Sequence, residues 1–191
     1  MAFSPTRRQI LGGIAVLALP LSSCASYQPP SRAMSEATIG PYRLGSGDQL
    51  RITVFEQPSL TNTYSVDQAG YIAFPLIGAV PARGRTLQEL EGVIAAKLKQ
   101  GYLRDPDVTI EVARYRSIFV MGEVGQPGQY SYVPGMTIQN AIAVAGGFSS
   151  RANQSSADVT RQINGEVISG RVPISDPVLA GDTIYVRERI F

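Results

Sequence analysis

Five acidic side chains are the residues whose type could support hydrolytic chemistry in this sequence: Asp48, Glu56, Asp67, Glu123 and Asp182. A glycosidase needs two carboxyl groups on either side of the scissile bond, about 5–10 Å apart. No spacing in the sequence brings two of these acids together. Asp48, Asp67 and Asp182 instead lie close to glycines in turn-like segments, where a short acid bonds to its own backbone. We therefore predict that these carboxylates fix turns and are not catalytic.

The sequence contains no other catalytic pattern. It has no histidine, which excludes a Ser–His–Asp or Cys–His site and histidine ligands for a metal. The serines lack a G-x-S-x-G elbow, and neither a Walker loop nor a G-x-G-x-x-G motif is present. The glycine-rich segment 122–128 ends in Pro127-Gly128, which is typical of a turn after a strand. We expect a protein that is not an enzyme and that binds no cofactor and no metal.

The first 24 residues carry the three parts of an export signal. Arg7 and Arg8 precede an apolar run over residues 10–19, and small residues stand directly before Cys24. The run is too short to span a bilayer, which takes about 20 apolar residues. We predict a signal peptide over residues 1–23. The segment around Arg7 and Arg8 resembles a twin-arginine export signal, and the general secretory route is the alternative.

Cys24 completes a segment that resembles a bacterial lipobox, Leu21-Ser22-Ser23-Cys24. In that pattern the peptide is cut before the cysteine, whose thiol and new amino group are acylated, so we predict lipidation at Cys24. The alternative is a buried free cysteine, but Cys24 is the only cysteine and stands where a lipobox requires one. Ala25 and Ser26 follow it, which resembles sorting to the outer membrane. Acyl chains would anchor the protein to that membrane.

The chain has a formal charge of +2, and this excess comes from the two arginines of the predicted export signal. Of the 17 basic side chains, Arg7 and Arg8 precede the predicted cleavage site, which leaves 15 basic against 15 acidic groups. A neutral body argues against nucleic acid as a partner, because phosphate binding needs clustered basic residues. The arginines form either solvated surface pairs or pairs between subunits, for which the rigid guanidinium is better suited than lysine. They are spread along the body at Arg51, Arg83, Arg85, Arg114, Arg116, Arg151, Arg161 and Arg171.

Residues 24–41 are rich in Ser, Pro and Ala and show no periodicity, which is typical of a flexible tether. Beyond them, alternating apolar residues predict strands over 50–54 and 108–112. The turn residues at 67–70 separate two further β-rich runs, 63–66 and 71–74. The first half of the body is therefore predicted to be rich in strands.

Two helices are predicted from their capping residues. Thr86 and Glu89 form a capping box, and apolar residues follow at helical spacing until Gly101. Thr137 caps a second helix, which ends at Gly146-Gly147. Each half of the body therefore has one helix.

The second half also contains strand signals. The continuous apolar run 118–121 predicts a strand buried on both faces. Asn164-Gly165 predicts a two-residue hairpin, and a last strand is expected over 183–187. The entry to that strand, Gly181-Asp182, repeats Gly47-Asp48 of the first half; it is either a sign of related modules or common turn chemistry.

Strands combined with one helix in each half predict an α+β fold. The boundary falls around residues 114–117, which divides the body into domains at 42–115 and 116–191.

Taken in order, these motifs resemble the bacterial polysaccharide export outer-membrane lipoproteins. The first domain is similar to the export domain of that family at residues 42–52, 66–78, 84–87 and 105–108. The second domain is similar to its soluble-ligand-binding β-grasp (SLBB) module at residues 120–128, 137–147 and 180–184. Alanine at position 180 replaces the proline of the family's closing Pro-Gly-Asp motif.

The resemblance implies a homo-oligomeric ring in the periplasm, anchored by lipid to the outer membrane, that passes a finished polysaccharide chain outward. It also implies an inner-membrane polysaccharide co-polymerase as partner, and no catalysis. Larger members continue into an amphipathic helix that forms the outer-membrane pore, whereas only a few residues follow the last predicted strand here. We therefore expect that this chain alone does not cross the outer membrane.

Two other functions remain open on the sequence. The β-grasp module by itself is compatible with a lipid-anchored periplasmic module that binds a glycan or a small ligand, because a fold does not fix a function. A secreted carbohydrate-modifying enzyme is the third reading, and no residue pattern supports it.

Overall fold

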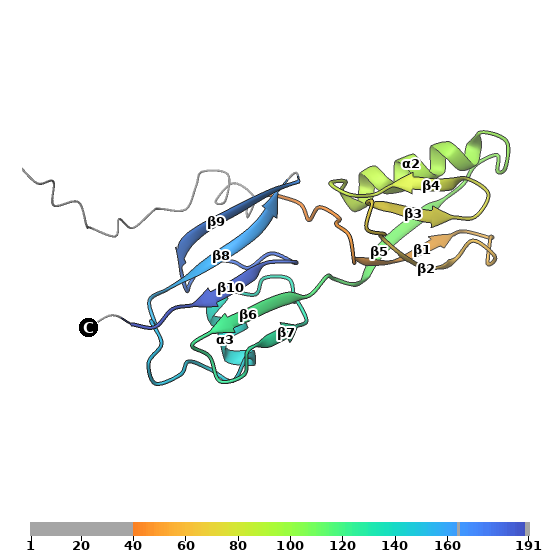
Figure 1. Cartoon of the computed structure of the whole chain (residues 1–191). Helices are drawn as coiled ribbons and strands as arrows, with labels where there is room; N and C mark the ends of the chain where they lie inside the picture. Colours follow the sequence, from red (N-terminus) through yellow and green to blue (C-terminus); the bar gives the residue numbers. More distant parts are fainter. Residues whose placement is uncertain (1–39, 164, 190–191) are drawn as a thin grey trace, which may run out of the picture.

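The computed structural model describes residues 40–163 and 165–189 and has a strand-rich α+β fold. Figure 1 shows two bodies joined by a single extended segment between strands β5 and β6. We call the body of β1–β5 and helix α2 domain 1, and the body of β6–β10 and helix α3 domain 2. Each domain has its own cluster of buried apolar side chains. The predicted α+β class is confirmed.

Domain 1 is built on two small antiparallel sheets. β1 (Gln49–Val54) lies between β2 (Asn62–Ser65) and β5 (Val108–Arg114). β3 (Tyr71–Phe74) pairs with β4 (Gly78–Pro81). The alternation that predicted β1 is confirmed, since every second residue of this strand is buried.

The turn predicted at residues 67–70 forms, but it does not join two paired strands. The Tyr71 N–H donates to the Asp67 Oδ1 atom at 2.8 Å, and the Gly70 N–H donates to the Asp67 carbonyl at 3.0 Å. β2 pairs with β1 on one side of the turn, and β3 pairs with β4 on the other. The four-residue strand β4 was not predicted, because its only buried residue, Val80, gives no alternating pattern.

Helix α2 (Leu87–Lys99) covers the sheets of domain 1. The predicted capping box is confirmed: the Thr86 hydroxyl accepts from the Glu89 N–H, and the Glu89 carboxylate accepts from the Thr86 N–H. Apolar residues at helical spacing are fully buried at Leu90, Ile94 and Leu98. The cap and the apolar stripe thus fix where the helix begins and which face meets the core.

Domain 2 contains one five-stranded sheet in the order β7-β6-β10-β8-β9. The strands are β6 (Ile118–Gly122), β7 (Gly128–Tyr130), β8 (Ser156–Ile163), β9 (Glu166–Pro173) and β10 (Thr183–Val186). β10 pairs with β6 in parallel, and the other neighbours are antiparallel. The predicted hairpin between β8 and β9 is confirmed by their register, while Asn164 itself lies outside the described residues.

Helix α3 (Ile138–Val144) packs on one face of this sheet. Thr137 caps it as predicted, and Asn140 completes a capping box that was not predicted. Ile138, Ala141 and Ile142 are buried against the sheet. None of the described helices is long and apolar enough to cross a membrane.

The prediction that residues 118–121 are buried on both faces is wrong. Ile118 and Val120 are fully buried, whereas Phe119 and Met121 are each 43% exposed. The reason is that the core of domain 2, including α3, covers only one face of the sheet, so the outward residues of β6 meet solvent. A continuous apolar run shows that a strand is apolar on both faces, but not that both faces are covered.

The capping box of α2 gives a direct test of the fold. Replacing Thr86→Ala removes the acceptor for the Glu89 N–H and should lower the free energy of unfolding by about 1 kcal/mol. Urea unfolding followed by circular dichroism measures this change. Thr86→Ser keeps the hydroxyl and is the control; an equal loss in both variants would contradict the role of the cap.

Candidate functional site

A tight turn leads into β1 and places a carboxylate at the boundary between the domains. The Asp48 N–H donates to the Gly45 carbonyl at 3.2 Å, and the Gly45 N–H donates to Asp48 Oδ2 at 2.8 Å. Gly47 has φ +94°, a left-handed conformation that glycine adopts without strain. The sequence prediction that Asp48 bonds to its own backbone in a turn is therefore confirmed. The turn leaves its carboxylate completely buried.

The buried Asp48 carboxylate is held by groups from a distant part of the chain. Arg116, in the segment between β5 and β6, donates its backbone N–H to Oδ1 at 2.9 Å and its Nη1 to Oδ2 at 3.0 Å. The Tyr42 hydroxyl lies 2.8 Å from both carboxylate oxygens and accepts from Arg116 Nη1 at 3.0 Å. A buried charge is tolerated when it is paired and hydrogen-bonded. The burial of the charged Asp48 side chain therefore depends on its contacts with Arg116 and Tyr42.

The side chain of Arg116 also contacts domain 2. Its Nε atom lies 2.8 Å from the position that a Cβ would take at Gly181, and its guanidinium leaves no room for one at Gly45. The guanidinium carbon lies 5.6 Å from the centre of the Tyr42 ring, within the range of a cation–π contact. Arg116 is thus enclosed by the two glycine turns, one from each domain. We call Tyr42, Asp48, Arg116 and Gly181 the junction cluster.

Two further tyrosines, Tyr115 and Tyr132, extend the junction cluster into domain 2. The ring centres of Tyr42 and Tyr115 are 4.9 Å apart with planes at 86°, and those of Tyr115 and Tyr132 are 5.4 Å apart at 75°. Edge-to-face pairs of this kind add to the energy of area burial. Burial raises the pKa of Tyr42 and the pKa of Tyr132 above the ordinary tyrosine value. The aromatic row therefore connects the two domains through Tyr115.

The second Gly-Asp pair forms the same turn. The Asp182 N–H donates to the Leu179 carbonyl at 3.1 Å, the Leu179 N–H donates to Asp182 Oδ2 at 2.8 Å, and Gly181 has φ +88°. Arg161 of β8 binds the Asp182 carboxylate with two hydrogen bonds of 2.9 and 2.6 Å. The repeated motif thus encodes one turn with one arginine partner in each domain.

The sequence gives no sign of these arginine partners. It predicts surface pairs or contacts between subunits for the arginines, but Arg161 is 4% exposed and pairs with Asp182 inside domain 2. Arg116 is half-buried and pairs with Asp48. Neither pairing gives a local sequence signal, because the partners are 21 and 68 residues apart.

The remaining acidic candidates occupy separate places. Asp67 lies in the turn before β3, and Glu123 accepts from the Ser149 hydroxyl at 2.6 Å after β6. Glu56 is exposed in the turn that follows β1. Both buried carboxylates, Asp48 and Asp182, are neutralised by arginine. The candidate functional site that the described residues form is therefore a structural junction between domains.

The predicted lipidation residue Cys24 and the predicted export-signal residues Arg7 and Arg8 lie outside the described residues. Within the described ranges, no group of three Asp, Glu, His or Cys residues could hold a metal ion.

Comparison with known proteins assigns both domains. Residues 36–113 match the family model for polysaccharide biosynthesis/export protein, and residues 117–171 match that for the SLBB domain. These ranges include most of domain 1 and the larger part of domain 2. The chain belongs to the polysaccharide biosynthesis/export protein family and carries an SLBB domain, which confirms the resemblance seen in the motifs.

Three relatives illustrate the similarity. The chain is 35% identical to the EPS I polysaccharide export outer membrane protein EpsA of Ralstonia solanacearum, over 78% of this chain and 48% of that protein. It is 34% identical to the exopolysaccharide production protein ExoF of Rhizobium meliloti, over 59% of this chain and 30% of that protein. It is 28% identical to the polysialic acid transport protein KpsD of Escherichia coli, over 60% of this chain and 22% of that protein. The chain thus spans less than half the length of each.

The junction cluster predicts a large cost for removing one carboxylate. Asp48→Asn keeps the size of the side chain but removes the charge that Arg116 pairs with, and it should lower the free energy of unfolding by about 2–4 kcal/mol. Denaturant titration of the full chain measures the loss. Asp67→Asn, in an exposed turn, is the matched control and should change stability by less than about 1 kcal/mol. Similar losses in both variants would contradict the role of Asp48.

Burial of Tyr42 predicts a pH dependence of stability. The raised pKa means that folded Tyr42 keeps its proton above about pH 10, where an unfolded tyrosine loses it. The contribution of the raised Tyr42 pKa to stability is therefore complete below about pH 10. As the pH rises further, the free energy of unfolding falls. Tyr42→Phe should reduce that decline by up to about 1.4 kcal/mol per pH unit. Unfolding curves between pH 9 and 11 measure it; parallel declines in both proteins would refute the assignment.

Proposed function

We propose that the protein is an outer-membrane lipoprotein component of a capsular or exopolysaccharide export channel. The observation that carries the proposal is the match of both domains, in order, to an export family model and an SLBB model. The names of three relatives describe a polysaccharide export outer membrane protein, exopolysaccharide production and polysialic acid transport. A polysaccharide chain is accordingly the proposed cargo, and export rather than catalysis is the proposed activity.

Export of a long polymer places a physical demand on the protein. A conduit must not hold any one sugar tightly, so it requires a water-filled opening wider than a ligand pocket. Identical subunits provide one when head-to-tail interfaces close a ring. Ring closure also requires that every copy has the same shape, and the junction cluster supports this by joining the two domains through the ion pair of Arg116 with the buried Asp48. We therefore propose a homo-oligomeric ring in the periplasm.

The proposed anchor lies at the start of the mature chain. Export directed by Arg7 and Arg8 would be followed by cleavage of residues 1–23 and acylation of Cys24. Residues 24–41 then form the tether between the lipid and domain 1 (42–115), which is followed by domain 2 (116–191). Eighteen residues span at most about 60 Å when extended, which allows the body to stand away from the membrane. The proposed partner is an inner-membrane polysaccharide co-polymerase, and nucleic acid is not a partner.

Deletion and complementation in the native bacterium test this proposal. Loss of the gene should reduce surface polysaccharide, and the wild-type gene should restore it. Complementation with Cys24→Ala should give a protein absent from the membrane fraction, since the acylated residue is gone. Normal surface polysaccharide in a deletion strain without a paralogue would contradict export. A Cys24→Ala protein that still sediments with the outer membrane would contradict the lipid anchor.

A further inference from the structure

The segment 115–117, which lies outside any strand, is the joint between the two domains. Within the described residues, no backbone hydrogen bond links a residue before Arg116 to a residue after it, and the sheets of the two domains are separate. Domains that share only a small interface move relative to each other unless something holds them. The angle between domain 1 and domain 2 therefore depends on side chains at the joint.

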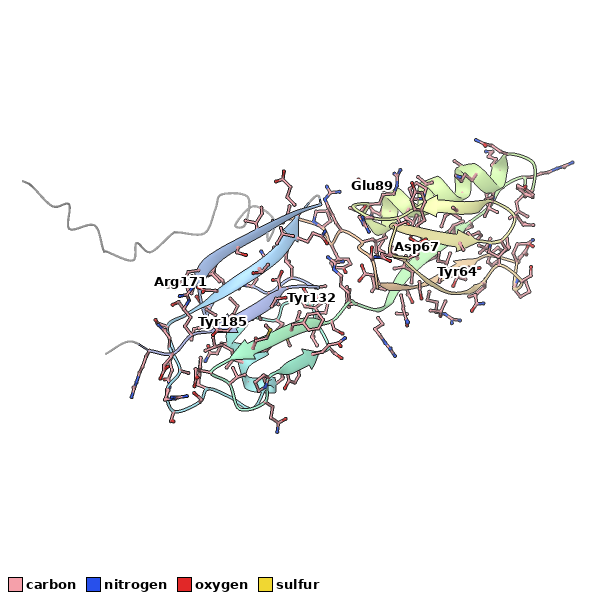
Figure 2. The ribbon with its side chains drawn as sticks, in the orientation of Figure 1. Tyr64, Asp67, Glu89, Tyr132, Arg171 and Tyr185 are labelled. Atoms are coloured by element: carbon pink, nitrogen blue, oxygen red, sulfur yellow. The ribbon has the colours of Figure 1, made fainter. Side chains whose placement is uncertain are left out.

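Two side chains of the joint contact domain 2. The ring of Tyr115 packs edge-on against Tyr132, which Figure 2 shows at the end of domain 2 nearest the joint. The Arg116 side chain fills the space that Gly181 leaves open by having no Cβ. Both side chains can turn about their own bonds, so these contacts fix the angle only if Tyr115 and Arg116 are themselves held from domain 1.

Tyr42 holds both of these side chains. Its ring packs edge-on against Tyr115 with the ring centres 4.9 Å apart, and it lies within cation–π range of the Arg116 guanidinium. Its hydroxyl accepts from Arg116 Nη1 at 3.0 Å. Asp48 also bonds to Arg116, through the carboxylate. Tyr42 thus contacts the two side chains of the joint that reach domain 2.

Tyr42 stands at the start of a strap, residues 42–48, that belongs to domain 1 and passes beside the joint (Figure 1). Leu44 fixes the strap: its N–H donates to the Arg85 carbonyl at 2.9 Å, its carbonyl accepts from the Gly84 N–H at 2.8 Å, and its side chain is buried. Tyr42, by contrast, makes no backbone hydrogen bond to another described residue. Its position therefore depends on its side chain, whose contacts can break while the two buried cores stay intact.

We propose that Tyr42 is a latch that holds the joint closed. With its side chain in place the two domains keep one angle; with the side chain withdrawn they change angle while both stay folded. Tyr42 is a positioning residue, because it acts on domain 2 through Tyr115 and Arg116. In hinge motions a few residues between rigid bodies absorb the change in backbone angles, and residues 115–117 take that part here.

The latch has a consequence for the lipid anchor, and this consequence alone rests on the proposed function. The proposed tether, residues 24–41, ends directly before Tyr42. A pull on the tether therefore reaches Tyr42 before it reaches the backbone hydrogen bonds of Leu44. The anchor would thus act on the joint and not on the core of either domain.

The distance between two spin labels tests the latch. Ala96→Cys in α2 and Ala143→Cys in α3 place one label on an exposed helix position of each domain. Both enter the full chain carrying Cys24→Ala, which has no other thiol. Labelled protein is diluted with unlabelled protein, so that each distance lies within one copy. Pulsed electron paramagnetic resonance should give one narrow distance distribution for this parent protein and a wider one after Tyr42→Ala, with unchanged circular dichroism.

Tyr102→Ala, which removes an exposed tyrosine after α2, is the matched control and should keep the narrow distribution of the parent. A parent distribution that is already wide would overturn the latch, and so would a Tyr42→Ala distribution as narrow as that of the parent. Equal widening in Tyr102→Ala would overturn it as well, because the effect would not belong to the joint. The labelled chain carries Cys24→Ala, so these results do not depend on the lipid anchor, which membrane fractionation tests separately.

Discussion

A carboxylate that is removed from water must be neutralised and fully hydrogen-bonded, and Asp48 meets this condition only with the help of Arg116. Desolvating an unpaired carboxylate costs several kcal/mol, which is a large part of the stability of an ordinary domain. The fold of domain 1 near β1 therefore depends on the position of the segment that leads to domain 2. The ion pair, with the Tyr42 hydroxyl between its members, couples the geometry of both domains.

This coupling matters for an assembly of identical copies. A closed ring requires each interface to repeat the same rotation, so a hinge that bends freely would give open or irregular oligomers. The junction cluster resists bending in two ways. The guanidinium of Arg116 is enclosed between the turns at Gly45 and Gly181, and the ring of Tyr115 packs edge-on between Tyr42 and Tyr132. Bending at this segment would break the ion pair and the aromatic contacts together.

Local features of the fold could be predicted from the sequence, and long-range ones could not. The alternation in β1 and the Thr86/Glu89 capping box of α2 involve residues within a few positions of one another, so their patterns are visible in the sequence. The turn at Asp48 was predicted for the same reason, because Gly47 stands next to it in the sequence. The partner of Asp48, Arg116, is 68 residues away and is one of many arginines in the sequence. Similarly, the apolar run at residues 118–121 predicted the strand β6, but it could not show that α3 covers only one face of the sheet.

The two Gly-Asp turns differ in where the arginine comes from, and this difference divides their roles. In domain 2, Arg161 is supplied by β8, the antiparallel neighbour of the strand that the turn leads into, so the turn is closed within one sheet. In domain 1 the arginine comes from the segment that leaves the domain. The same Gly-Asp turn is therefore closed within domain 2 but links domain 1 to domain 2. Domain 2 provides the arginine partner of its own buried carboxylate, Asp182. Domain 1 does not, because the partner of Asp48 is Arg116 in the segment that leads to domain 2.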